Sequence, residues 1–132
     1  MLSASEIQYL KTQRLARVAT VSPKGEPEVS PVGFEYEGGH FYIGSHDQST
    51  FFRTRRYKNI ESGNRRVSLV VDDLASVDPW KPRGIKVSGA AQVVKRKGMF
   101  GEGSYLQITP RVSVSWGIEP PSEGKWYSLR RH

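Results

Sequence analysis

Residues 15–45, LARVATVSPKGEPEVSPVGFEYEGGHFYIGS, decide the fold class of this chain. Residues 15–21 are rich in β-forming side chains and end at the turn sequence Ser22-Pro23-Lys24-Gly25. Residues 28–36 alternate as a second strand, and Glu37-Gly38-Gly39 turns the chain into a third strand over residues 40–45. Short strands joined by tight turns predict a meander of antiparallel hairpins.

Helices are predicted on both sides of this meander. Ser3-Ala4-Ser5-Glu6 has the form of a capping box, so a short helix should run to about Gln13. Phe52, Arg56 and Ile60 follow one another at spacings of four, which predicts a helix over residues 49–61 capped by Ser49 or Thr50.

Three further strands are predicted in the second half of the chain, over residues 67–71, 84–94 and 105–118. Residues 72–83 carry two prolines and are expected to form a loop, and the basic, glycine-rich residues 95–104 a mobile connection. Many short strands with few helices predict a mainly β fold, a small closed or partly closed antiparallel barrel. We expect one domain over residues 1–118 and a tail over 119–132 that is flexible or docked on a partner subunit.

Composition narrows the choice of partner and compartment. The 132 residues carry a net charge of +7, which favours an anionic partner, and the chain has no cysteine for disulfides, thiolate metal sites or thiol nucleophiles. No apolar run is long enough to span a membrane, and the first residues lack the pattern of a secretory signal, so we expect a cytoplasmic protein. The three histidines show no metal-ligand spacing, and no metal site is predicted.

Two clusters of cations and aromatic rings are candidate anion sites. The helix around Arg56 has four cations in six positions, and Arg56 shares its face with apolar side chains, which favours a phosphate or carboxylate ligand. The alternative is a stem packed on the core with its head in water. Trp80-Lys81-Pro82-Arg83-Gly84 would suit a ring-bearing anion, or form an ordinary surface loop. The sequence contains neither G-x-G-x-x-G nor a Walker motif.

Several strings, taken with the order of elements, resemble the pyridoxamine 5'-phosphate oxidase-like split-barrel flavoproteins. More narrowly, they resemble the small oxidoreductases of that superfamily that depend on the deazaflavin coenzyme F420. The resemblance covers about residues 5–118 and is carried by RLARVATV (14–21), SPVGF (30–34), TRRYKN (54–59), RVSLVVDDL (66–74), DPWKPRGI (78–85) and VSWG (114–117).

The resemblance implies a cofactor site and a homodimer. Arg56, three residues before Asn59, would bind the cofactor phosphate, where many relatives have lysine. Two segments would line the isoalloxazine-like ring, namely Ser30, Pro31 and Val32, and Ile43, Gly44 and Ser45. Trp80, Lys81 and Arg83 would reach the cofactor of the partner subunit or its acidic tail.

By the same resemblance, reduced deazaflavin would deliver a hydride to a conjugated small-molecule substrate. No protein group is assigned as catalytic, and Tyr57 and His46 are only candidate proton donors. Two alternatives stay open at this point. One is an FMN-binding oxidase or reductase of the same fold, and the other is a non-enzymatic module that binds flavin or nucleic acid through its basic groups.

Overall fold

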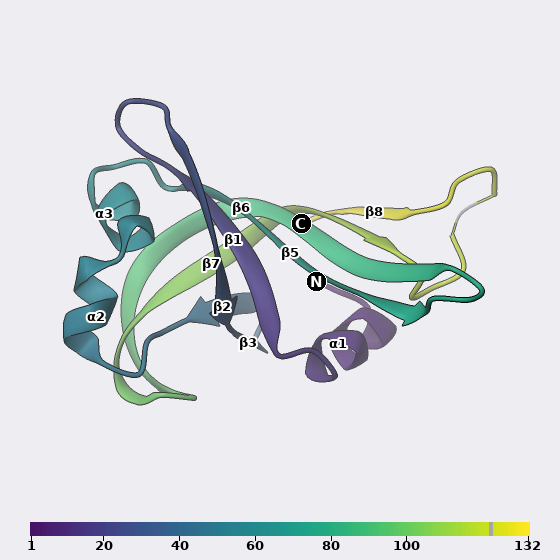
Figure 1. Cartoon of the computed structure of the whole chain (residues 1–132), viewed down its shortest axis with the longest axis horizontal. Coiled ribbons are helices and arrows are strands. Elements are labelled where there is room, and N and C mark those ends of the chain that lie inside the picture. Colours follow the sequence, from purple (N-terminus) through teal and green to yellow (C-terminus); the bar gives the residue numbers. More distant parts are fainter. Residues whose placement is uncertain (122) are drawn as a thin grey trace.

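The two longest strands, β6 (Lys81–Gly98) and β7 (Gly101–Trp116), form one curved hairpin that runs through the whole molecule (Figure 1). The computed structural model describes residues 1–121 and 123–132. The other elements are α1 (Ala4–Lys11), β1 (Leu15–Val21), β2 (Pro27–Gly33), β3 (Glu35–Glu37), β4 (His40–Ile43), α2 (Gln48–Arg53), α3 (Arg55–Glu61), β5 (Arg66–Ser76) and β8 (Ser128–Arg131).

The connection from β2 to β3 explains why the sheet curls. The strand order is β2-β1-β5-β6-β7-β4-β3, with β8 beside β7, so β2 and β3 lie at opposite edges of the sheet. Only Phe34 separates these two strands in the sequence. Because one residue spans only about 3.5 Å, the two edges must approach each other there. The predicted mainly β, split antiparallel barrel is therefore confirmed.

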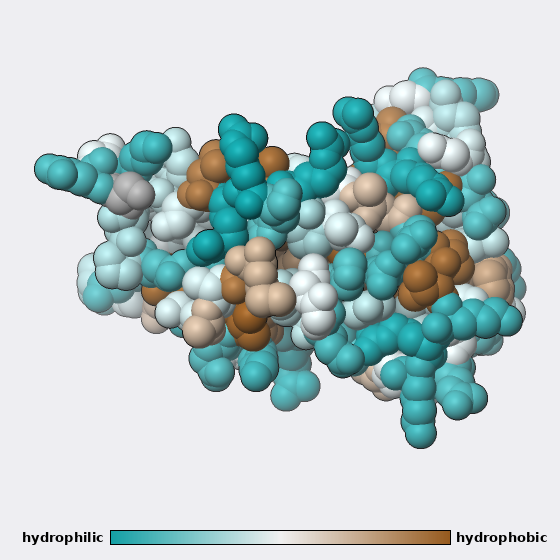
Figure 2. Space-filling model, turned by 180° about the vertical axis from the view of Figure 1, so that it is seen from behind, coloured by the Kyte–Doolittle hydropathy of each residue, from teal (hydrophilic) through white to brown (hydrophobic). Residues whose placement is uncertain are grey.

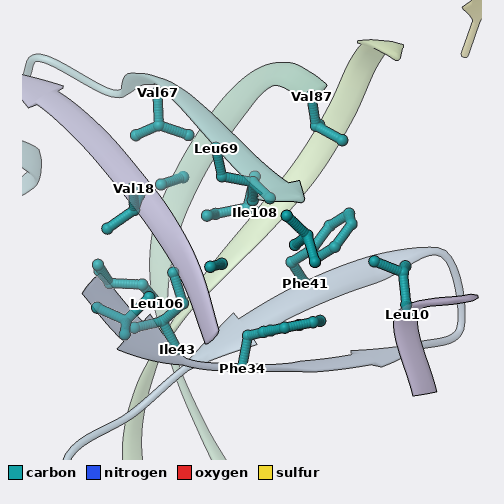
Figure 3. Packing of buried hydrophobic residues seen from close by; sticks show 14 of the residues in the cluster. Leu10, Val18, Phe34, Phe41, Ile43, Val67, Leu69, Val87, Leu106 and Ile108 are labelled. Atoms are coloured by element: carbon teal, nitrogen blue, oxygen red, sulfur yellow. The ribbon is translucent and has the colours of Figure 1, made fainter. Parts of the chain in front are cut away.

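The hydrophobic core fills the inside of this curved sheet (Figure 3). Alternate residues of β1 point inward, so Ala16 and Val18 are fully buried while Leu15 is exposed. They meet side chains from β4, β5, β6 and β7, and Leu10 of α1 covers one end of the cluster. The core thereby occupies one face of β1, and side chains such as Leu15 are left on the other.

The N-terminal helix begins at the predicted capping box. The Ser3 hydroxyl accepts a hydrogen bond from the Glu6 backbone N–H, and the Glu6 carboxylate accepts one from the Ser3 N–H. The helix ends at Lys11, two residues before the predicted end. Such small differences at a terminus reflect fraying of the last turn.

The helix predicted over residues 49–61 is two helices. Thr54 adopts extended backbone angles and ends α2, and its hydroxyl accepts a hydrogen bond from the Tyr57 N–H to begin α3. Asp47 caps α2, so the prediction of Ser49 or Thr50 as the cap is wrong. The break turns Phe52 outward, where it is 42% exposed, while Ile60 stays in the core.

Residues 72–83 are mostly strand, so the predicted loop is wrong. Strands β5 and β6 stay paired from Asp72 and Gly84 out to Ser76 and Lys81, which leaves a short turn. The hydropathy pattern does not reveal this strand, because Asp72 and Asp73 are polar. The strand tolerates both aspartates because each is paired with an arginine. Arg17 lies 3.3 Å from Asp72, and Arg83 lies 2.7 Å from Asp73.

The predicted mobile connection over residues 95–104 is also wrong, because β6 and β7 continue through it and only Met99 and Phe100 form the turn. Two side chains outside the turn hold it, one of them far away in the sequence. The Glu35 carboxylate accepts a hydrogen bond from the Met99 N–H at 2.7 Å, and the Tyr105 hydroxyl accepts one from the Phe100 N–H at 3.0 Å. The anchor from Glu35 leaves no local sequence signal, because Glu35 lies 64 residues before Met99.

Part of the C-terminal tail belongs to the sheet of its own chain. Strand β8 pairs with β7 from Val112 to Ser115, so residues 128–131 form a strand in the sheet of their own chain. Docking of the tail on a partner subunit stays a prediction. The tail prediction also includes Ser122, which lies outside the described residues. The Arg130 guanidinium, 3.0 Å from the carboxylate of Glu6, helps to fix the strand.

Candidate functional site

The guanidinium of Arg56 reaches from α3 to β2. Its Nη1 donates a hydrogen bond of 3.4 Å to the hydroxyl of Ser30. Its Nε is buried and has no hydrogen-bond partner among the described residues. A buried cationic N–H without an acceptor costs free energy, so this position fits an anionic group brought by a ligand.

A carboxylate lies in the same region. Glu28 precedes Ser30 by two residues on β2, so both side chains leave the strand on one face. Its Oε2 is likewise buried without a hydrogen-bond partner in the described part of the chain. Burial lowers the pKa of the Arg56 guanidinium, and the negative charge of Glu28 opposes that change. The site therefore combines a cation and an anion that each have an unpartnered atom.

A cavity of about 390 Å³ opens beside α3 at the turn between β1 and β2. Its lining consists of Ser22, Pro23, Lys24, Glu26, Pro27, Glu28, Arg55 and Asn59. The amide of Asn59, a buried side chain, donates a hydrogen bond of 2.9 Å to the hydroxyl of Thr20. Asn59 thus anchors α3 to β1, and the fold brings together Arg56, Asn59 and Ser30.

The two segments predicted to line a ring differ in what they expose. Val32 and Ile43 point into the core and are 6% and 0% exposed, so their side chains are committed to packing. Gly44 is buried, and a Cβ there would lie 2.5 Å from the ring of Tyr105. Ser30, Pro31 and Ser45 keep exposed surface. Pro31 points to the face of β2 opposite to Ser30, so contact with a ring on the Ser30 face is left to Ser30, Ser45 and the backbone.

The turn between β6 and β7 forms a wall of this region that the sequence did not indicate. The Phe100 ring packs edge-on against the ring of His46, with centroids 4.5 Å apart. A Cβ added at Gly33 would lie 3.7 Å from both Met99 and Phe100, so the turn reaches β2. An apolar thioether and an aromatic ring thus border the backbone of β2 and the end of β4.

Trp80, Lys81 and Arg83 lie far from Arg56 within this chain. They belong to the β5–β6 hairpin, at the end of the long axis opposite to α2 and α3 (Figure 1). Trp80 is 66% exposed. The fold therefore does not bring this hairpin to the Arg56 site of the same chain.

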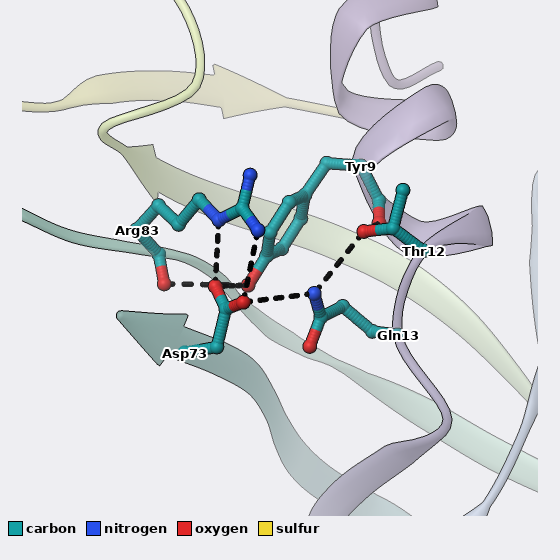
Figure 4. Close-up of polar contacts among 5 residues, drawn as sticks. All are labelled: Tyr9, Thr12, Gln13, Asp73 and Arg83. Carbon is teal, nitrogen blue, oxygen red and sulfur yellow. Dashed lines mark hydrogen bonds and ion pairs between the residues drawn. The ribbon is translucent and has the colours of Figure 1, made fainter. Parts of the chain in front are cut away.

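The charge of Arg83 is already paired (Figure 4). Its Nε and Nη2 donate to the two carboxylate oxygens of Asp73 at 2.7 and 3.0 Å, which helps to hold the pKa of that carboxyl below its usual range. The Tyr9 hydroxyl donates to the same carboxylate at 3.0 Å, and burial together with Asp73 raises the pKa of Tyr9. This cluster joins α1 to the β5–β6 hairpin.

The two candidate proton donors have different surroundings. Tyr57 packs against the rings of Phe51 and Phe52, with centroids 5.4 and 5.0 Å away. His46 is exposed beside Phe100. In residues 1–121 and 123–132, no three His, Asp or Glu side chains gather as a metal site requires, and no helix is long and apolar enough to cross a membrane.

Comparison with known sequences decides the family. The family model of pyridoxamine 5'-phosphate oxidase matches residues 5–116 of the chain. The chain belongs to the pyridoxamine 5'-phosphate oxidase family. It is also 38% identical over 120 residues to a 5a,11a-dehydrotetracycline/5a,11a-dehydrooxytetracycline reductase from Streptomyces rimosus, a match that covers 86% of this chain and 82% of the relative. Together these matches support an oxidoreductase of this family.

Solved structures share the fold at much lower identity. A conserved hypothetical protein from Mycobacterium tuberculosis is 17% identical, with a TM-score of 0.68 over 95% of this chain and 94% of the other. The heme storage protein HutZ from Vibrio cholerae is 16% identical, with a TM-score of 0.59 over 83% and 91% of the two chains. Because the fold recurs in a protein named for heme storage, it does not by itself identify the cofactor.

In this member of the pyridoxamine 5'-phosphate oxidase family, sequence analysis missed Glu28 and the Met99–Phe100 turn. Glu28 could have been found, because it shares strand parity with Ser30 and faces the helix that carries Arg56. The turn could not, because its position depends on hydrogen bonds to Glu35 and Tyr105.

Proposed function

We propose that this chain is an F420-dependent reductase that uses reduced deazaflavin to transfer a hydride to a conjugated carbon of a small-molecule substrate. The observation that carries the proposal is the buried Nε of Arg56, which has no hydrogen-bond partner in the part of the chain that the structure describes and fits a cofactor phosphate. The reductase from Streptomyces rimosus, 38% identical, supports reductive chemistry on a small molecule.

The residues around Arg56 divide the task of binding. The Arg56 guanidinium holds the phosphate, and the Ser30 hydroxyl, 3.4 Å from its Nη1, keeps the guanidinium directed at that position. The net charge of +7 attracts the oligoglutamate tail of F420 over longer distances. The cofactor supplies the hydride, and the protein supplies orientation and exclusion of water.

The substrate class follows from the relative. Its name denotes the reduction of a dehydrotetracycline, and we extend this class of polycyclic, conjugated substrate to the present chain. The apolar Met99–Phe100 turn, which borders β2 at Gly33, suits the flat face of such a molecule. Tyr57 and His46 stay the candidate donors of the accompanying proton.

A single-turnover assay tests this function. Chemically reduced F420 is mixed with the protein and 5a,11a-dehydrotetracycline, and the return of oxidised deazaflavin absorbance is followed beside product formation. We expect stoichiometric oxidation that depends on both protein and substrate. Turnover with reduced FMN but none with reduced F420 would favour the FMN-dependent alternative of the same fold.

We also propose a cytoplasmic homodimer. Apolar patches interrupt a mostly hydrophilic surface in Figure 2. Leu15 and Val29, large apolar side chains on the neighbouring strands β1 and β2, are 51% and 66% exposed. A second copy would cover such side chains and bring its β5–β6 hairpin to the first site. Light scattering should give twice the 14.9 kDa of one chain, and a monomer at micromolar concentration would contradict the dimer.

A further inference from the structure

The candidate phosphate site contains a carboxylate, that of Glu28, although phosphate sites ordinarily contain only cations and N–H donors. Among the described residues, Oε2 of Glu28 and Nε of Arg56 are both buried without a hydrogen-bond partner, and both lie at the candidate site. The proposed function uses Arg56 but gives no role to Glu28. A negative charge this close to a bound phosphate repels it, so its presence needs a reason.

Strand geometry places the two charges on the same surface. Glu28 and Ser30 leave one face of β2, and Arg56 donates its hydrogen bond to Ser30 from the helix that covers this face. Glu28 also lines the cavity beside α3. The negative charge of Glu28 raises the pKa of Arg56 against the effect of burial, which agrees with this proximity.

The repulsion from Glu28 depends on the charge of the ligand. A phosphate monoester such as that of FMN carries about −1.5 to −2 at pH 7. The phosphate of F420 is a diester, because it joins the ribityl chain to the tail, and it carries a single negative charge. Since Coulomb repulsion scales with charge, Glu28 penalises the monoester about twice as much as the diester.

We infer that Glu28 is a specificity-determining residue that removes the advantage a phosphate monoester would otherwise have over a phosphodiester at the Arg56 site. This inference rests on the proposed function, because it assumes that the phosphate of a flavin-type cofactor binds at Arg56. Arg56 supplies the attraction, and Glu28 offsets enough of it that a second negative charge on the ligand no longer increases affinity.

Two flavins that differ only in the phosphate test the inference. FMN and its phosphate methyl ester carry the same ring and chain, and quenching of flavin fluorescence gives the Kd of each with the wild-type protein. We expect the methyl ester to bind at least as tightly as FMN, although it carries less charge. Tighter binding of FMN by the wild type, or binding of neither flavin, would overturn the inference.

The variant Glu28→Gln isolates the carboxylate, because it keeps the side-chain shape and removes the charge. We expect affinity for FMN to rise about tenfold and affinity for the methyl ester about threefold, so that the preference moves towards FMN. Glu61→Gln, an exposed position on α3, removes the same charge away from the site and should keep the wild-type ratio. An equal change for both flavins in Glu28→Gln would overturn the inference.

The result separates this inference from the proposed function. FMN and its methyl ester share the same ring and chain, and neither has the deazaflavin ring. Their affinity ratio therefore reports on the phosphate site alone. A protein that prefers the methyl ester but binds F420 no better than FMN would retain the role of Glu28 and lose the F420 assignment. If the protein binds F420 tightly, but the ratio of its affinities for FMN and the methyl ester is unchanged in Glu28→Gln, the F420 assignment is retained and the role of Glu28 is lost.

Discussion

The carboxylate of Glu6 on α1 lies 3.0 Å from the guanidinium of Arg130 on β8, which ties the two ends of the chain together. Glu6 is only 1% exposed, and it also caps its own helix. Truncation of Arg130 would therefore leave a buried charge short of a partner. We expect Arg130→Ala to lower the free energy of unfolding by about 2 kcal/mol in urea denaturation.

Arg131→Ala is the matched control, because Arg131 is exposed on the same strand. It should change the free energy of unfolding by less than about 0.5 kcal/mol. Equal effects of the two variants would mean that β8 acts through its backbone pairing and not through the contact with Glu6.

The same carboxylate makes stability depend on pH. Burial alone would raise the pKa of Glu6, but hydrogen bonds from Ser3 and Ser115 and the charge of Arg130 hold it below its usual 4.5. A lowered pKa in the folded state means that Glu6 stabilises the fold above about pH 4.5 and that this contribution is lost as the pH falls through the folded pKa.

In Glu6→Gln, the free energy of unfolding should therefore fall less steeply below this pH than in the wild type. Thermal denaturation across the acid range measures the difference. Parallel curves would assign the acid sensitivity to other carboxylates.

Gly44 is required by the ring packed over it. A Cβ at this position would lie 2.5 Å from the ring of Tyr105, which the core holds in place. We expect Gly44→Ala to destabilise the protein by about 1 to 3 kcal/mol. At Gly33 the nearest side-chain atoms would be 3.7 Å away, so Gly33→Ala should be tolerated. Similar chemical denaturation midpoints for the two variants would contradict this packing.

The variant Arg56→Ala tests whether the candidate site binds a phosphate. If the buried Nε and the Nη1 of Arg56 face the ligand, Arg56→Ala removes a charge-assisted contact, and affinity for F420 should fall by about 1.5 to 3 kcal/mol, roughly 10- to 150-fold. Arg56→Lys should recover much of this loss because it keeps the charge. Titration calorimetry measures all three proteins.

Lys58→Ala serves as the control for general loss of positive charge, because Lys58 is exposed on the same helix and does not line the cavity at the site. A matched loss of affinity in Lys58→Ala and Arg56→Ala would show that the helix acts through its overall field.

The sequence was sufficient for features that depend on neighbours along the chain. The capping box at Ser3 and the first β-hairpin are local, and they appear as predicted. The interruption at Thr54 was missed because a spacing of four continues across it. The full length of β5 was missed because Asp72 and Asp73 are polar strand residues paired across the sheet.

The candidate site, too, combines features that depend on the local sequence with features that depend on distant contacts. Arg56 was predicted from its place on an apolar helix face, and the fold brings it to Ser30. The place of the β5–β6 hairpin, which carries Trp80, could not be predicted, because it depends on how this late part of the chain is directed relative to α3 (Figure 1). The local sequence around Glu35 does not indicate that its carboxylate anchors the Met99–Phe100 turn.

The most direct test of the account is a titration of the protein with F420 and FMN side by side at low and high salt. The acidic tail of F420, attracted by a net charge of +7, and the single charge of its phosphodiester should together give F420 at least about tenfold tighter binding at low salt. The preference should shrink as salt screens the tail. Equal affinities at low salt, or tighter binding of FMN, would contradict the F420 assignment while leaving the fold and the family intact.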